Sequence, residues 1–380
     1  MRILILGTAY PFRGGIAAYN ERLAKELIKE GHEVEILTFT VQYPRFLFPG
    51  RTQYTDASAP EGLSIRRILN SVNPVTWIKT AMEVRNFNPD IVIIKYWHPF
   101  MSPCLGTVAR LSGRNKKVKT RIISIFDNVI PHERKPADRI LTKYFTDSID
   151  GAIVMSKSVA GDIRKFNLKV PIEFNPHPLY DDYGELLPRE EALSMLGLSE
   201  ENHYLLFFGF IRAYKGLDIL LKAMGDSHLR DLKLKLIVAG EFYESRIPYD
   251  EIIRKFDLAN KVILYDSFIR EDEVRIFFSA ADLVVQPYKS ATQSGVTQIA
   301  FHFEKPMLVT DVGGLAEIVY DKHCGYVVSP DPAAVAEAIA DFFVNKRKDS
   351  FTEEVKKQKL KYTWDKLTVK IVELYEKIKK

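Results

Sequence analysis

Residues 2–39 read RILILGTAYPFRGGIAAYNERLAKELIKEGHEVEILTF, and this stretch contains the pattern that predicts the fold. It begins with an apolar run that is typical of a parallel strand buried on both faces, followed by a loop that contains Gly14 and Gly15. Apolar residues at helical spacing then extend to Gly31, a typical helix stop, and a second apolar run follows. The order strand, glycine loop, helix and strand predicts a βαβ unit.

The same alternation continues along the first half of the chain. Apolar runs at 90–95, 121–126 and 150–155 predict further buried strands, and a helix is expected at 137–148. From 173 to 191 the apolar periodicity stops and prolines enter, which predicts a linker. The first half therefore predicts a parallel sheet covered by helices on both faces.

The second half repeats this pattern. Strands are expected at 204–209, 234–240, 262–265, 283–287, 306–310 and 325–328, and helices at 216–224 and 271–280. Together the two halves predict an α/β protein of two facing Rossmann-like domains with doubly wound parallel sheets, 1–180 and 190–363. The amphipathic segment 364–380 is expected to pack back on the first domain.

Length and composition exclude several classes of protein. With 380 residues, of which 46% are hydrophobic and 27% charged, the chain is neither disordered nor a coiled coil. The net charge of +5 is small for this length and does not indicate nucleic-acid binding. Cys104 and Cys324 lie far apart in sequence, which excludes a disulfide scaffold and fits a reducing compartment. No stretch approaches the roughly 18 apolar residues of a membrane span, and the first apolar run is too short for a signal peptide, so a cytoplasmic protein is expected.

A pair of cations follows the first strand of the second half. Arg212 and Lys215 lie in a glycine-bounded loop between a strand and a helix. Arginine can pair bidentately with a diphosphate, and lysine acts as a point charge. The alternative is that both are solvated loop charges, but the strand–loop–helix context favours an anion site.

Two more loops of the second half have the composition of a helix start. Gln293, Ser294, Gly295 and Val296 follow a strand, and helix N-termini attract anions through unpaired N–H groups and the helix dipole. An ordinary N-cap is the alternative. After the next strand, a glycine pair is expected to begin another helix, and Glu317 could accept hydrogen bonds from sugar hydroxyls or only occupy the first helical turn.

In the first half, polar residues follow three of the expected strands. Gly14 and Gly15 permit close approach of backbone N–H groups to a phosphate or a sugar, although a tight loop explains them equally well. His98 follows the strand at 90–95, and Asp127 and Asn128 follow the strand at 121–126. A lone histidine is more often structural, but ligands bind at the carboxyl ends of strands in such sheets, which favours a role in a cleft.

A run of basic residues without any acid extends from 110 to 121. Its members are Arg110, Arg114, Lys116, Lys117, Lys119 and Arg121. Such a run could contact anionic lipid headgroups at the inner face of a membrane, with about 1 kcal/mol per basic residue. A solvated loop is an equally good explanation.

Motifs of other enzyme classes are absent from the sequence. It contains no GxxxxGK[ST], HExxH, CxxC or GxSxG, and the loop with Gly14 lacks the GxGxxG spacing. Kinase, zinc hydrolase, serine hydrolase and oxidoreductase interpretations therefore lose their main support. No cofactor and no metal site are expected.

Taken together, the motifs resemble family 4 glycosyltransferases, which are retaining enzymes with the GT-B architecture. The resemblance covers nearly the whole length and rests on the order of five segments. These are PFRGGIAAYNERLAKELIKEGHEVEILT, FFGFIRAYKGLDILLKA, VAGEFYE, FIREDEVRIFFSAADLVVQPY and KPMLVTDVGGLAEIV.

The resemblance implies roles for individual residues. Arg212 and Lys215 match the pair that holds the nucleotide diphosphate, and His98 matches the histidine beside the transferred sugar. Gly15 would lie near the donor phosphate or the acceptor. The remaining matches are Phe268 and Ile269 against the base, and Ser294, Gly295 and Val296 against the phosphates. The acceptor would bind near Asp127 and Asn128.

One departure from the family pattern concerns two glutamates that most members carry before the Lys305-Pro306 pair. The first usually contacts the donor sugar and the second the ribose, and here Ala291 and Ile299 occupy these positions. A variant branch with a Gln-Ser-Gly-Val loop is the better match, and here neither position supplies a carboxylate to the sugar or the ribose.

The expected function is transfer of a sugar from a nucleotide-diphosphate sugar to a glycan, a lipid-linked glycan or a small hydroxyl acceptor, with retention of configuration. Polysaccharide or glycoconjugate synthesis is the expected context. The alternatives are a nucleotide-sugar-binding protein without transferase activity, or an epimerase or phosphorylase on the same fold. The base, the sugar and the acceptor stay open.

Overall fold

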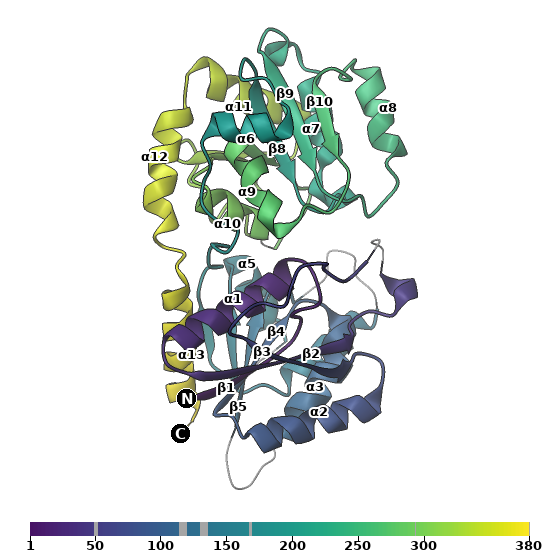
Figure 1. Ribbon diagram of the computed structural model, residues 1–380, viewed down its shortest axis with the longest axis vertical. Coiled ribbons are helices and arrows are strands. Elements are labelled where there is room, and N and C mark those ends of the chain that lie inside the picture. The colour runs from purple at the N-terminus through teal and green to yellow at the C-terminus, as the bar shows by residue number, and fades with distance from the viewer. Residues whose placement is uncertain (49–51, 114–119, 130–135, 167–168, 293, 380) are drawn as a thin grey trace. The chain divides into compact units, whose positions relative to one another are not determined.

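The computed structural model describes residues 1–48, 52–113, 120–129, 136–166, 169–292 and 294–379. The chain divides into two compact units. Unit 1 comprises Met1–Pro178 and Thr363–Lys380, and unit 2 comprises Leu179–Tyr362. Each unit is a parallel sheet with helices on both faces (Figure 1). The predicted α/β class of two doubly wound sheets is confirmed.

The sheet of unit 1 has seven parallel strands in the order β3-β2-β1-β4-β5-β6-β7. Their bounds are β1 Arg2–Leu6, β2 Glu33–Val41, β3 Ser64–Asn70, β4 Ile91–Tyr96, β5 Arg121–Phe126, β6 Gly151–Val154 and β7 Ile172–Phe174. The two edge strands, β3 and β7, were not predicted from the sequence. β3 reads SIRRILN and is exposed at alternate positions, so it lacks a continuous apolar run, and β7 has only three residues.

In the described part of unit 1, six α-helices cover the sheet. They are α1 Gly15–Lys29, α2 Pro74–Phe87, α3 Ser102–Ser112, α4 Asp138–Thr146, α5 Lys157–Arg164 and α13 Trp364–Ile378. The last of these comes from the far end of the sequence and packs on α1, β5 and β6. Thr368 donates a hydrogen bond to Glu30, and Lys377 pairs with Glu173, so polar contacts fix this helix at two points.

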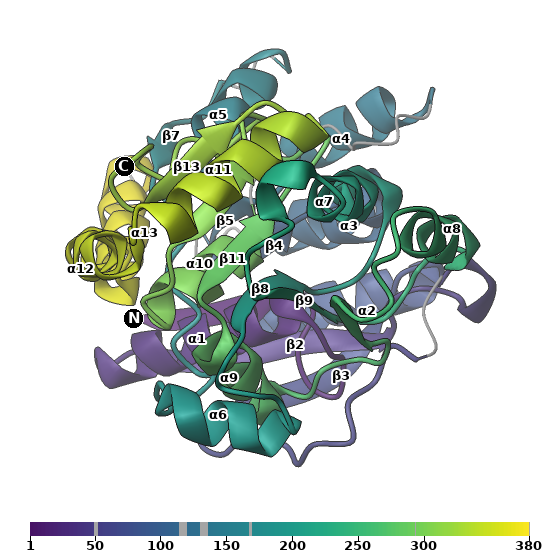
Figure 2. The same ribbon diagram turned by 90° about the horizontal axis from the view of Figure 1, so that it is seen from above.

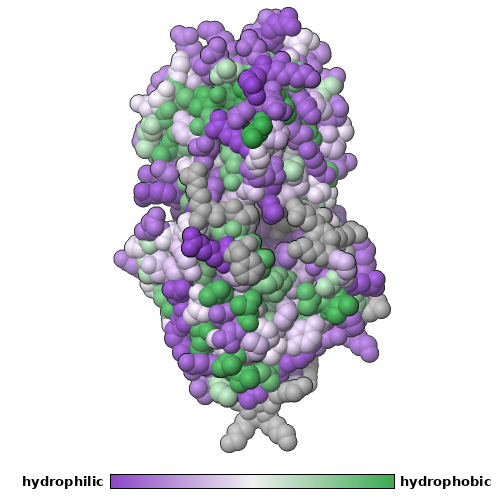
Figure 3. All heavy atoms as spheres, turned by 90° about the vertical axis from the view of Figure 1, so that its right-hand side faces the viewer, coloured by the Kyte–Doolittle hydropathy of each residue, from purple (hydrophilic) through white to green (hydrophobic). Residues whose placement is uncertain are grey.

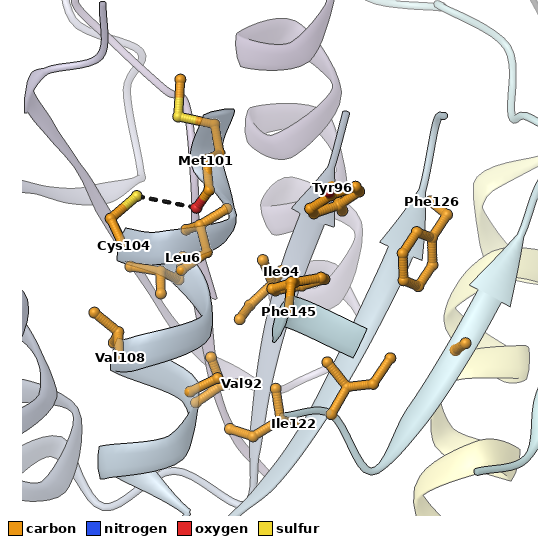
Figure 4. Packing of buried hydrophobic residues seen from close by; sticks show 14 of the residues in the cluster. Leu6, Val92, Ile94, Tyr96, Met101, Cys104, Val108, Ile122, Phe126 and Phe145 are labelled. Carbon is orange, nitrogen blue, oxygen red and sulfur yellow. Dashed lines mark hydrogen bonds between the residues drawn. The ribbon is translucent and has the colours of Figure 1, made fainter. Parts of the chain in front are cut away.

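The core of unit 1 lies between the central strands and helices α3 and α4. Tyr96 of β4 stacks on Phe145 of α4, with ring centroids 4.5 Å apart, and the Tyr96 hydroxyl is paired with Ser102 and Thr142. Cys104 of α3 is buried in the same cluster (Figure 4). Apolar strands with helices on both faces therefore form a fixed platform for the loops at the carboxyl edge of the sheet.

Unit 2 has six parallel strands in the order β10-β9-β8-β11-β12-β13. Their bounds are β8 His203–Phe208, β9 Leu234–Ala239, β10 Val262–Tyr265, β11 Leu283–Gln286, β12 Met307–Thr310 and β13 Gly325–Val328. Its α-helices are α6 Arg189–Leu196, α7 Leu217–Met224, α8 Ile247–Lys255, α9 Glu271–Ala280, α10 Gly295–His302, α11 Pro332–Val344 and α12 Lys348–Lys359. In Figure 2, α6 and α9 lie together on one side of this sheet, and α7 and α11 on the other.

One predicted element of unit 2 is wrong. Residues 311–320 form a series of turns and not a helix. The reason lies at Gly313, which has a φ of 52°. An added Cβ at this position would overlap the carbonyl oxygen of Ala291. This close approach requires glycine in the left-handed region, so the contact with Ala291 sets the backbone where the helix was expected to begin.

Candidate functional site

Three neighbouring strands of unit 2, β8, β11 and β12, end at the same edge of the sheet, and their loops are packed directly on one another. An added Cβ at Gly216 would overlap the carbonyl oxygen of Pro287, and the Lys289 amide donates to the Tyr214 carbonyl over 2.7 Å. The loop after β12 meets the loop after β11 at Gly313 and Ala291. This convergence builds the candidate donor site, because side chains far apart in sequence are brought to one place.

Lys215 is a buried cation in this site. It ends a short 3-10 helix, Ala213–Lys215, and is 8% exposed. Burial lowers the pKa of the Lys215 ammonium, the Tyr214 hydroxyl opposes this shift, and the charge of Arg212 adds to it. Among the described residues, no carboxylate forms an ion pair with Lys215. A bound anion would therefore relieve an uncompensated charge.

Gly209, directly after β8, is the point where this lysine meets helix α10. An ideal Cβ at Gly209 would lie 3.1 Å from Lys215 Nζ and 3.6 Å from Val296 Cγ2. The ammonium group and the first turn of α10 are thus neighbours across the same glycine. The structure brings together Lys215 and Val296, two of the residues singled out from the sequence, and the charge of Arg212 acts on Lys215.

The N-terminus of α10 is oriented by a buried glutamine that sequence reasoning missed. Gln286, at the end of β11, donates from Nε2 to Ser294 Oγ over 2.7 Å and accepts from Thr297 Oγ1 over 2.8 Å. Ser294 occupies the N-cap position, but no side chain caps this helix. The first-turn amides, starting at Gly295, therefore keep their capacity to bind an anion. Gln293 lies outside the described residues.

Aromatic rings lie beside the cationic part of the site. Phe210 follows Gly209, and its ring centroid is 4.3 Å from that of Tyr243 and 6.0 Å from that of Phe268. Ile269 is buried next to this group at 8% exposure. The family resemblance predicts Phe268 and Ile269 but not Phe210 and Tyr243, although aromatic residues after β8 and β9 were an available signal.

Glu317 has an exposed side chain within the turns that follow β12. It is therefore not in the first turn of a helix, as one of the two interpretations had it. The segment that contains Glu317 is packed against the loop after β11, where Gly313 contacts Ala291.

In unit 1 the predicted residues also lie at the carboxyl edge of the sheet, after the adjacent strands β1, β4 and β5. His98 Nδ1 accepts a hydrogen bond from the Phe100 amide over 3.1 Å, so a neutral His98 ring carries its proton on Nε2. Asn128 Oδ1 is buried and has no hydrogen-bond partner among the described residues. Gly14 has a φ of 102° and caps α1, with open space where a side chain would be.

A buried polar cluster that was not predicted from the sequence lies next to Asp127. Lys95 Nζ is 2.7 Å from Asp127 Oδ1 and 3.2 Å from the ring centroid of Tyr19, and the lysine is 1% exposed. Burial lowers the pKa of Lys95, while the Asp127 carboxylate opposes this shift. The Tyr19 ring also contacts His177, whose pKa is lowered to about 3 by burial and by the Lys95 charge. A lysine inside the apolar strand 91–96 was the available signal.

Two members of the basic run are among the described residues. Arg121 is 5% exposed within β5 and is therefore unavailable to a membrane surface. Arg110 lies 3.8 Å from the ring centroid of Tyr144 and donates to the Tyr144 carbonyl. Arg114, Lys116, Lys117 and Lys119 lie outside the described residues. Within the described ranges, no helix combines the length and apolar character that crossing a bilayer requires.

Two Rossmann-like units, each with polar loops at the carboxyl edge of its sheet, define the class of GT-B proteins. Residues 13–179 match the family described as Glycosyltransferase Family 4, and residues 202–345 match Glycosyl transferases group 1. Together the two matches cover most of the chain, which therefore belongs to the group 1, family 4 glycosyltransferases.

Among curated proteins, the chain is similar to the uncharacterized glycosyltransferase MJ1607 of Methanocaldococcus jannaschii, with 24% identity over 99% of this chain and 98% of that protein. It is also similar to O-antigen chain mannosyltransferase C of Escherichia coli, with 23% identity over 91% of this chain and 89% of the relative.

Solved structures show the same fold. Sucrose-phosphate synthase of Thermosynechococcus elongatus superposes with a TM-score of 0.79 at 15% identity, over 99% of both chains. Anabaena HepE in complex with UDP-glucose superposes with a TM-score of 0.74 at 13% identity, over 99% of this chain and 100% of HepE.

Proposed function

We propose that this glycosyltransferase moves a sugar from a nucleotide-diphosphate sugar to a hydroxyl acceptor, with retention of the anomeric configuration, in polysaccharide or glycoconjugate synthesis. The observation that carries the proposal is the buried ammonium of Lys215. This ammonium lacks a carboxylate partner among the described residues. Gly209 lies next to both the ammonium and Val296, which is in the first turn of α10. A diphosphate is the ligand that this combination of cations and helix amides fits best.

In this proposal unit 2 binds the donor. Arg212 and Lys215 neutralise the diphosphate, and the amides that follow Ser294 bind its oxygens. The rings of Phe210 and Phe268 offer flat surfaces against which the base packs. The likeness to HepE, which was solved with UDP-glucose, supports a nucleotide-sugar donor.

Unit 1 would bind the acceptor through the polar residues at its own sheet edge. Asp127 and Asn128 offer oxygens that accept hydrogen bonds from hydroxyl groups, and Asn128 Oδ1 is unpartnered among the described residues. The similarity to a mannosyltransferase of O-antigen chains supports a glycan or lipid-linked glycan as acceptor. Gly14 has open space where a side chain would be, which leaves room for close approach of a ligand to the backbone.

The reaction then needs no protein nucleophile. The acceptor oxygen bonds to the anomeric carbon on the face from which the diphosphate leaves, and the acceptor's proton passes to the departing phosphate oxygen. Negative charge grows on the diphosphate as its bond to the sugar breaks, so Arg212 and Lys215 stabilise the transition state more than the ground state. His98 Nε2–H would donate a hydrogen bond to the transferred sugar.

A second candidate function is nucleotide-sugar binding without transfer. The observation that favours it is the apolar pair Ala291 and Ile299, 7% and 6% exposed, at the positions where most family members carry glutamates. Without these carboxylates, the donor sugar and the ribose would lose two hydrogen-bond acceptors.

One experiment tests both candidates. Binding of UDP, GDP and ADP is measured by calorimetry, and hydrolysis of the matching nucleotide sugars is then followed over time. We expect one nucleotide to bind, Lys215→Ala to weaken its binding at least about tenfold, and turnover to fall at least about a hundredfold.

The matched control is Lys222→Ala, because Lys222 lies on the following helix and pairs with Asp218 at 3.7 Å. This variant should behave like the wild type. A folded Lys215→Ala protein with wild-type binding and turnover would refute the diphosphate site. Tight binding of a nucleotide sugar without any hydrolysis or transfer would favour the second candidate.

A further inference from the structure

Helix α2 of unit 1 carries apolar side chains on two opposite faces. Its inner face buries Ala81 and Val84 in the core of the unit. On its outer face Val75, Ile78 and Met82 are 72%, 49% and 55% exposed. Spacings of three and four residues place these three side chains in one row along the helix. Among the described residues, nothing buries this row.

The same helix has a net positive charge. Lys79 and Arg85 are exposed, and the one acid of the helix, Glu83, is bound by Arg66 over 2.8 Å. Arg85 Nε donates to the Leu111 carbonyl over 2.8 Å, at the end of α3 where the basic run of the sequence begins. The outer face of α2 is thus apolar along its centre and positive beside it.

We propose that this outer face docks unit 1 on an anionic bilayer surface. Val75, Ile78 and Met82 would enter the boundary between headgroups and acyl chains, while Lys79 and Arg85 would remain among the anionic headgroups. An exposed apolar row flanked by basic residues is the pattern of a helix that lies in the membrane interface. Figure 3 shows groups of hydrophobic side chains on the surface of unit 1.

A second copy of this chain fits the face less well. A stable interface buries about 800 Å² per partner, far more than one row of three side chains provides. In a symmetric pair, Lys79 and Arg85 of one copy would also meet the same cations of the other, which repel one another. The surface of an anionic membrane complements both the charge and the narrow shape of the row.

The test is sedimentation of the full chain with phosphatidylcholine vesicles, with and without phosphatidylglycerol. We expect binding only to the anionic vesicles and loss of binding at high salt. The triple substitution Val75→Ser, Ile78→Ser and Met82→Ser should weaken vesicle binding about a hundredfold. Lys79→Gln alone should weaken it about fivefold.

The controls come from unit 2, where Met195 and Val344 are 55% and 66% exposed and so match Met82 and Val75. Met195→Ser and Val344→Ser should leave vesicle binding unchanged. Absence of wild-type binding, or equal binding by the triple variant, would overturn the proposal. A concentration-dependent mass in light scattering that the triple substitution abolishes would instead show a self-association interface. Because the assay needs neither donor nor acceptor, it can fail while the proposed reaction stands.

Discussion

Lys95 in unit 1 and Lys215 in unit 2 are both buried lysines near the carboxyl edge of a parallel sheet, and burial lowers the pKa of each. They differ in what compensates their charge. Lys95 is 2.7 Å from the Asp127 carboxylate and contacts the Tyr19 ring, whereas no described carboxylate pairs with Lys215, and the charge of Arg212 acts against it. One ammonium is thus compensated within its own unit, and the other is left with an uncompensated positive charge.

The difference shows how the same residue type can serve two purposes. A buried ion pair holds both partners in fixed positions, so Lys95 fixes the Asp127 carboxylate at the edge of its sheet. An unpaired buried cation costs stability in the free protein, and the cost is recovered when an anion binds. The contrast therefore predicts opposite effects when each lysine is replaced by an apolar residue of similar length.

The largest expected effect is on stability. Lys95→Met should lower the free energy of unfolding by about 3 kcal/mol, because Asp127 loses its cation in a largely buried site. Lys215→Met should leave stability unchanged or raise it, because the change removes an uncompensated buried charge. Urea unfolding, followed by circular dichroism with and without nucleotide, measures both effects.

The double substitution Lys95→Met and Asp127→Asn sharpens this comparison. It removes both charges and should recover part of the stability lost in Lys95→Met. A loss of stability in Lys215→Met as large as that in Lys95→Met would mean that both lysines are structural.

A smaller effect should appear in the pH dependence of unit 1. The pKa of His177 is lowered to about 3, so the folded chain keeps this ring neutral while the unfolded chain protonates it near pH 6.5. The contribution of His177 to stability is thus fully present above about pH 6.5 and is reduced by about 2 kcal/mol at pH 5, because stability falls by up to about 1.4 kcal/mol per pH unit between the two pKa values.

Urea midpoints measured across this range for the wild type and His177→Gln isolate the contribution of this histidine. The pH-dependent difference between the two proteins should shrink in the Lys95→Met background, because Lys95 no longer repels the imidazolium. Parallel pH curves for wild type and His177→Gln would contradict the assignment.

The smallest expected effect concerns the glycine beside Lys215. Gly209→Ala should weaken nucleotide binding several-fold, because its Cβ would lie 3.1 Å from Lys215 Nζ and displace the ammonium. Gly31→Ala in unit 1 is the matched control, since Gly31 also has a positive φ but has open space around it. Both should lose about 1 kcal/mol of stability from backbone strain, and calorimetry should show weaker nucleotide binding only for Gly209→Ala.

Much of the fold could be predicted because its signals are local. Strands buried on both faces, such as β1 and β4, read as continuous apolar runs, and alternation with helices indicates a parallel sheet. Edge strand β3 could not be recognised, since it is half exposed and carries Arg66 and Arg67 in its centre. The helix expected after Gly313 does not form, because contact with Ala291, in another loop, sets the backbone there.

The candidate site likewise contains residues that could be predicted from the sequence and residues that could not. Arg212, Lys215 and His98 could be selected from their positions after strands, and their roles stay predictions. The cluster of Lys95, Asp127, Tyr19 and His177 depends on four segments that are distant in sequence. No local pattern encodes such a contact.

By itself, the sequence determined the α/β class, the order of the elements and which loops carry polar residues, because periodicity and turn chemistry act over a few neighbouring residues. Tertiary structure alone decided that Lys215 is buried without a described carboxylate partner, that Lys95 pairs with Asp127, and that one apolar face of α2 stays exposed. The physical reason is that burial and charge compensation depend on which distant segments pack together.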